Sequence, residues 1–166
     1  MSFKLSSPAF ENGQEIGKEF SGEGSDISPP LKWSQIPGGT QEFVLICEDP
    51  DAPGASEPFV HWLIYNISPS ISQLPKGISP QERLDLPIRA DQGTNSFHKV
   101  GYGGPMPPVG HGWHRYIFRL FALDAELGIA PGANKMQLLE AMKGHILAEA
   151  ECMGRYQRVD SKTHVA

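Results

Sequence analysis

The chain has 166 residues, with 14 Lys and Arg against 19 Asp and Glu, which gives a formal net charge of −5. This length predicts a single domain over residues 1–166. Because no cluster of basic residues occurs, the composition excludes a broad basic face for nucleic acid or for an acidic membrane surface.

Four apolar segments predict β-strands, since each is rich in Phe, Val, Ile, Leu or Tyr and is bounded by Pro or Gly. Several are apolar at consecutive positions, which indicates sheets that are covered on both faces. Residues 25–33 are expected to be extended, because a residue before proline avoids the helical conformation. With 18 glycines and 15 prolines spread among these segments, the sequence favours a loop-rich, mainly β fold. The predicted strands are residues 3–7, 43–48, 59–67 and 115–123.

One stretch near the C-terminus has the pattern of a helix. Asn134 can cap its start, with Gln137 at the spacing of a capping box, and Gly154 can end it. Residues 68–100 are polar and broken by prolines, so we expect a long irregular connection with one short helical turn. Four apolar side chains would share one side of the helix: Leu139, Met142, Ile146 and Ala150.

The compartment is expected to be the cytoplasm, without stable membrane insertion. No basic and apolar leader begins the sequence, and no apolar run reaches the roughly 18 residues that a membrane span needs. Cys47 lies in a predicted strand and Cys152 in the predicted helix. Since the cytoplasm disfavours disulfides, both should be buried free thiols.

Two polar segments interrupt the strand-like sequence. D-P-D-A-P at residues 49–53 follows one predicted strand, and V-H-W at residues 60–62 lies in the next. The second segment, P-P-V-G-H-G-W-H-R-Y at residues 107–116, leads into another strand, where His114 and Tyr116 face the same side. Imidazole and phenol groups can donate hydrogen bonds to a phosphate or a carboxylate.

The residues around these donors fit the same site. Asp49 or Asp51 can hold a histidine in one tautomer, although both are also ordinary turn formers. Glycines among residues 101–112 let backbone N–H groups approach a ligand. Because isolated polar groups at strand ends would be hard to satisfy, we expect four of them to converge on one cavity: Asp49, His61, His114 and Tyr116. We also expect a cis peptide bond at one of the prolines near the cavity, namely Pro58, Pro105, Pro107 or Pro108.

These motifs resemble those of the phosphatidylethanolamine-binding protein family, also called Raf kinase inhibitor proteins, and specifically its short bacterial and archaeal branch. S-D-I-S-P-P-L-K-W at residues 25–33 extends the likeness to nearly the whole chain. The resemblance implies a β-sandwich-like fold with a large Greek-key sheet, a smaller sheet and one or two peripheral helices.

The resemblance also implies a small pocket for phosphate-like groups, without a metal or a cofactor. Asp51 would lie behind this pocket or at its rim, and His111 receives no role. Met106 stands where the family often has a smaller residue, which affects the pocket mouth. The implied ligand-binding residues are Asp49, His61, Met106, Pro107, Pro108, His114 and Tyr116.

Three classes of function remain open at this point. The first, which we favour, is a non-enzymatic binding module for the phosphate or carboxylate group of a small ligand. The second is a regulatory protein that inhibits a kinase or a protease by surface contact, and the family analogy alone supports it. For short members of the family, a homodimer is the expected assembly. The third is a metal-dependent hydrolase, which lacks a nucleophile elbow and an H-E-x-x-H motif but has zinc-ligand types at Asp49, Asp51, His61, His111 and His114.

Overall fold

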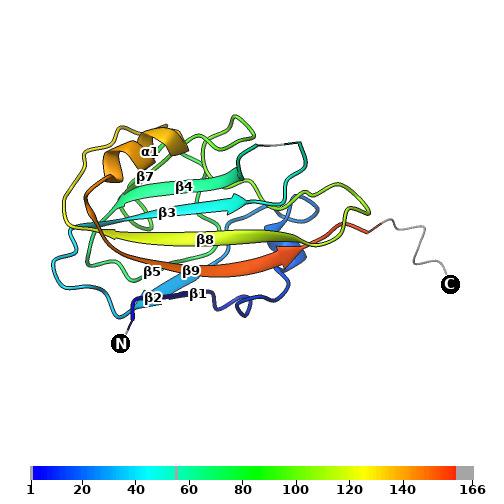
Figure 1. Cartoon of the computed structure of the whole chain (residues 1–166), viewed down its shortest axis with the longest axis horizontal. Coiled ribbons are helices and arrows are strands. Elements are labelled where there is room, and N and C mark those ends of the chain that lie inside the picture. Colours follow the sequence, from blue (N-terminus) through cyan, green and yellow to red (C-terminus); the bar gives the residue numbers. More distant parts are fainter. Residues whose placement is uncertain (1, 55, 160–166) are drawn as a thin grey trace.

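The computed structural model describes residues 2–54 and 56–159 as two antiparallel sheets with one helix on the outer side (Figure 1). The larger sheet has six strands in the order β6-β7-β4-β3-β8-β9, and the smaller has three in the order β1-β2-β5. This arrangement confirms the predicted mainly β, sandwich-like fold. The larger sheet comprises β3 (Glu42–Asp49), β4 (Phe59–Ile67), β6 (Arg83–Leu84), β7 (Ala90–Gln92), β8 (His114–Leu123) and β9 (Ile146–Tyr156). The smaller sheet comprises β1 (Lys4–Ser6), β2 (Leu31–Ser34) and β5 (Gln73–Leu74).

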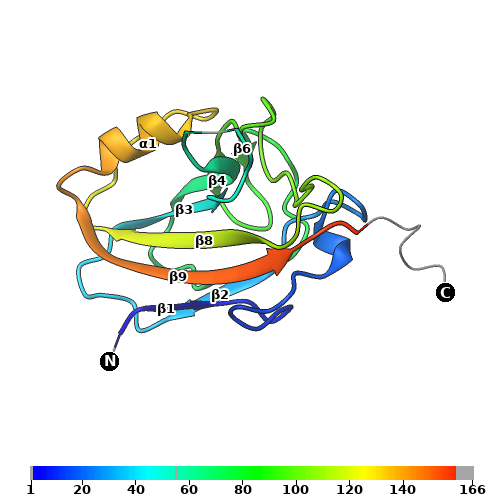
Figure 2. The same cartoon turned by 45° about the vertical axis from the view of Figure 1, so that its right-hand side comes forward.

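Strand β3 lies between two hydrophobic cores and is buried along its whole length. Alternate side chains of a strand point to opposite faces, so Phe43 and Cys47 enter the core shared with the smaller sheet. Val44 and Ile46 enter a second core on the other face. The helix α1 (Lys135–Met142) closes this second core, and Figure 2 shows it on the side of the larger sheet away from β1 and β2. The predicted covering of both faces is therefore confirmed.

The predicted C-terminal helix is correct only in its first half. Asn134 and Gln137 form the expected capping box, but the helix ends at Met142 and the chain turns at Gly144 with a positive φ of 80°. The rest is strand β9, in which buried Ala150 and Cys152 alternate with exposed Glu149 and Glu151. That alternation has a period of two and was the decisive pattern. No helix in the described residues is long and apolar enough to cross a membrane.

The connection at residues 68–100 is less irregular than predicted. It contributes the short strands β5, β6 and β7, and no helical turn occurs in it. The described chain contains a 3₁₀ turn, η1 (Lys18–Phe20), near its beginning instead. Strands of two or three residues are too short to show a period, which explains why the sequence pattern missed them.

The prediction of a cis proline beside the cavity is wrong. Within the described residues the cis peptide bond is Leu86–Pro87. The proline-rich loop turns instead at glycines with positive φ, such as Gly110 at 77° and Gly112 at 90°. Glycine adopts this conformation without the steric cost that a Cβ would bring.

Both thiols are buried and free, as predicted. Cys152 belongs to β9 rather than to a helix, and both cysteines pair in register with Phe118 of the intervening strand β8. Burial raises the pKa of Cys47 well above its usual value and that of Cys152 to about 12. Thiols in this state are poor nucleophiles.

Candidate ligand-binding pocket

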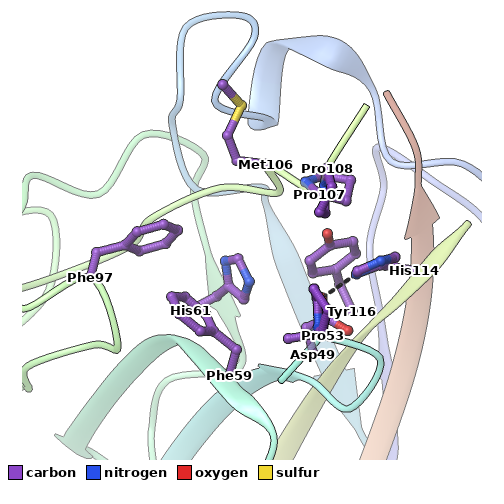
Figure 3. A pocket seen from close by; sticks show the side chains of 11 residues that line it. Asp49, Pro53, Phe59, His61, Phe97, Met106, Pro107, Pro108, His114 and Tyr116 are labelled. Carbon is purple, nitrogen blue, oxygen red and sulfur yellow. Dashed lines mark hydrogen bonds and ion pairs between the residues drawn. The ribbon is translucent and has the colours of Figure 1, made fainter. Parts of the chain in front are cut away.

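One cavity lies at the end of the larger sheet where β3 stops and β4 and β8 begin (Figure 3). Antiparallel pairing sets Asp49, the last residue of β3, opposite Phe59, the first of β4. The cavity has a volume of about 270 Å³. All the residues that the resemblance implied lie around it, and the predicted convergence is confirmed. Its lining is Asp49, Ala52, Pro53, Phe59, His61, Phe97, Met106, Pro107, Pro108, His114 and Tyr116.

His114 is held by hydrogen bonds at both ring nitrogens. Its Nδ1 lies 2.7 Å from Oδ2 of Asp49, and both side chains are buried. The other carboxylate oxygen of Asp49 accepts from the backbone N–H of Asp51 at 2.7 Å. On the far side of the ring, Nε2 of His114 lies 2.6 Å from Nδ1 of His111. Asp49 therefore acts through His114 rather than offering a free oxygen to the cavity.

His61 presents one ring nitrogen to the cavity. Its Nδ1 lies 2.6 Å from the carbonyl oxygen of Gly103, which can only accept, so Nδ1 carries a proton. In the described part of the chain this is the hydrogen bond that the ring makes, and Nε2 is left for a ligand. Burial lowers the pKa of His61, against the opposing effects of the Gly103 carbonyl and the Asp49 charge. The empty cavity thus favours a neutral imidazole.

Tyr116 supplies a hydroxyl that faces the cavity. The side chain stands at 1% exposure, and Figure 3 shows its oxygen pointing into the space below Pro107 and Pro108. No hydrogen bond to this hydroxyl is found among residues 2–54 and 56–159. Burial, reinforced by the Asp49 charge, raises the pKa of the phenol well above its usual value. Tyr116 is therefore a neutral donor that awaits a partner.

No Lys or Arg of the described residues lines the cavity. The nearest arginine in sequence, Arg115, turns outward and forms a two-pronged ion pair with Asp51, with N–O distances of 2.9 and 3.0 Å. This contact lowers the pKa of Asp51. Asp51 was expected behind the pocket or at its rim; it lies outside the lining, where its backbone N–H donates to Asp49 and its carboxylate pairs with Arg115. Within the described lining, His61 and His114 are the side chains that can carry a positive charge.

The sequence pattern missed an aromatic wall. Phe97 lies with its ring centroid 4.8 Å from Phe59 and 5.4 Å from His61, both in edge-to-face geometry. Phe97 is 37% exposed, yet its ring is tightly placed, because a Cβ at Gly103 would lie 2.6 Å from it. Phe97 sits in the connection that we read as irregular, and no periodic signal marks it.

The loop at residues 101–112 uses several of its N–H groups within the protein, among them those of Gly103 and Gly104. Gly103 donates to the carbonyl of His61 at 2.9 Å, and Gly104 donates to Oδ1 of Asp26 at 2.7 Å. These groups therefore position His61 rather than approach a ligand, contrary to our expectation. Figure 3 shows the Met106 side chain directed away from His61, and its sulfur packs over Gly22. Met106 still belongs to the cavity lining and is 43% exposed.

The histidines and aspartates do not assemble a metal site. In the described ranges, no group of three or more His, Cys, Asp or Glu side chains is placed to hold a metal ion. The imidazoles of His111 and His114 face each other across one hydrogen bond instead of facing a common centre.

Comparisons with known proteins agree with this geometry. A sequence model of the family described as phosphatidylethanolamine-binding protein matches residues 6–157. A UPF0098 protein of Pyrococcus horikoshii is 43% identical over 158 residues, which cover 95% of this chain and 78% of that protein. A solved structure of a putative phosphatidylethanolamine-binding protein homolog from Chlamydia trachomatis has a TM-score of 0.85 at 42% identity, covering 95% of this chain and 98% of that one. The structure of YbcL from E. coli has a TM-score of 0.86 at 30% identity, covering 95% and 99%.

Proposed function

The chain belongs to the phosphatidylethanolamine-binding protein family, and we propose that its pocket binds one small anionic group, a phosphate or a carboxylate, of an organic ligand. Membership of this family supports a ligand-binding module without catalysis. The observation that carries the proposal is a pair of polar groups without a protein partner, Nε2 of His61 and the hydroxyl of Tyr116, in a cavity that is otherwise lined by the paired Asp49 and His114 and by apolar side chains.

The charge balance defines how an anion would be held. The carboxylate of Asp49 is already paired with His114 and with a backbone N–H, so its charge does not oppose the ligand directly. Binding a second anion in a largely buried site still requires a compensating charge. Protonation of His61 supplies that charge and turns Nε2 into a donor, beside the neutral donor Tyr116.

Titration calorimetry with phenyl phosphate and with benzoate at pH 6.5 tests the proposal. We expect both ligands to bind the wild type, and His61→Ala to weaken them roughly tenfold or more, since a charge-assisted hydrogen bond is lost. His145→Ala is the control, because it removes a histidine that lies outside the cavity, where it pairs with Asp124. The same samples should release no phosphate from phenyl phosphate. If neither ligand binds the wild type, the proposal is contradicted. Steady hydrolysis of phenyl phosphate that His61→Ala abolishes would contradict the non-catalytic role.

The organic part of the ligand should lie on the aromatic wall. The cavity volume of about 270 Å³ corresponds to several water molecules at roughly 30 Å³ each. The cavity is therefore larger than a single phosphate group. Phe97→Ala should therefore weaken phenyl phosphate about three- to tenfold, as expected for the loss of an aromatic contact, and leave inorganic phosphate unchanged. Calorimetry with both ligands measures this difference. Equal weakening of both would show that Phe97 supports the fold of the site instead of contacting the ligand.

A further inference from the structure

His111 lies outside the cavity, yet it completes a line of hydrogen-bonded groups that ends inside it. The line runs from Asp49 through both nitrogens of His114 to Nδ1 of His111, with steps of 2.7 and 2.6 Å. His114 is 1% exposed, whereas His111 is exposed on a loop between Gly110 and Gly112. The buried imidazole thus meets solvent through a second imidazole.

The hydrogen bonds along this line differ in strength between its two protonation states. When His114 is neutral, its Nε2 accepts the Nδ1 proton of His111, which is an ordinary hydrogen bond between neutral groups. When His114 is charged, it donates to Asp49 on one side and to His111 on the other. Hydrogen bonds that involve a charged group are roughly twice as strong as neutral ones. A second proton on the pair would leave two donors facing each other, and the hydrogen bond between the rings would be lost.

We propose that His111 is a positioning residue that stabilises the charged form of His114 and thereby supports anion binding in the pocket. The binding step rests on the proposed function, whereas the action of His111 on His114 does not. The proton comes from solvent and is bound by the imidazole pair. The step makes and breaks only bonds to hydrogen.

The other ionisable groups around the pair do not replace His111. Arg115 is neutralised by Asp51, and Arg158 donates to the carbonyl of Pro107 at 2.6 Å. Tyr156 of β9 pairs in register with His114 of β8. Burial raises the pKa of Tyr116 and of Tyr156, so both phenols stay neutral. Asp49 therefore remains as the carboxylate directly bonded to the pair. Among the described residues, the ionisable groups on the segments packed around the pair are Asp49, Asp51, His61, Arg115, Tyr116, Arg155, Tyr156 and Arg158.

Nitrogen NMR of the histidine rings in the ligand-free protein tests the inference directly. At a fixed pH near 6.5, His111→Ala should lower the ratio of charged to neutral His114 roughly tenfold, as the loss of a charge-assisted hydrogen bond implies. His111→Gln should retain the wild-type ratio, because its amide oxygen accepts from Nε2 of His114. The ring of His145, paired with Asp124 at 2.9 Å, is the internal reference.

Benzoate affinity at the same pH supplies the second measurement. We expect His111→Ala to bind about three- to tenfold more weakly than the wild type, and His111→Gln to bind like it. If His114 has the same charge ratio in the wild type and in His111→Ala, the inference is overturned, whatever the affinities. If the ratios change as expected but the wild type binds no anion, the inference about the imidazole pair stands and the proposed function fails.

Discussion

Between pH 8 and pH 6, the affinity of the pocket for benzoate should rise roughly 10- to 100-fold. One proton taken up on binding changes the affinity at most tenfold per pH unit. In the empty pocket, burial lowers the pKa of His61, so the imidazole is neutral at pH 8. A bound anion favours its charged form, so the pKa of His61 rises in the complex. The affinity therefore increases as pH falls through the pKa of the complex and levels off below the lowered pKa of the empty pocket.

Benzoate separates the protonation of the protein from that of the ligand. A carboxylate with a pKa near 4 stays ionised from pH 6 to 8, whereas a phosphate ester titrates near pH 6. His61→Gln keeps a neutral donor but takes up no proton, so it should flatten most of the pH dependence. Calorimetry in buffers of different ionisation enthalpy counts the protons. Affinity that is constant with pH, or that rises toward alkaline pH, would rule out a histidine-charged pocket.

The fold was predictable where side-chain patterns extend over several residues. β3 and β8 gave long apolar runs, and the predicted bounds of β4 agree with those in the structure. The error in β9 arose because the apolar side chains Met142, Ile146 and Ala150 have helical spacing by coincidence. Gly154 was taken as a helix end, but it is a strand residue whose missing Cβ makes room for Ile16. Tertiary packing decided that position, and a local pattern does not contain it.

The polar part of the pocket was predictable because strand-end residues carried it. His61, His114 and Tyr116 lie on strands whose pairing brings them together. Phe97 was missed, since its place depends on contacts with Gly103 across a loop. The hydrogen bond between His111 and His114 depends on two glycines with positive φ, which let the chain turn back within three residues. Spacing alone also fits two side chains that point apart.

Gly104→Ala should destabilise the protein by about 2–4 kcal/mol. A Cβ at Gly104 would lie 2.3 Å from the carbonyl oxygen of Phe20 and 2.7 Å from Oδ1 of Asp26. The first is a backbone atom that cannot rotate away, and the second accepts the Gly104 N–H that anchors the loop. For a chain of this size, the expected decrease in Tm is roughly 5–15 °C.

Two other glycines distinguish this effect from a general cost of glycine replacement. Gly38 is exposed, has no atom within 4 Å of an added Cβ and has no positive φ, so Gly38→Ala should change the unfolding free energy by less than about 0.5 kcal/mol. At Gly22 an added Cβ would lie 2.8 Å from the sulfur of Met106, which is the flexible end of a half-exposed side chain. Methionine adapts its rotamer at low cost, so Gly22→Ala should lose less than about 1 kcal/mol. Chemical denaturation of the three variants measures these differences.

The loop at Gly104 also places the Gly103 carbonyl against Nδ1 of His61. Gly104→Ala should therefore weaken benzoate binding as well. An unchanged affinity would show that His61 is held without that contact.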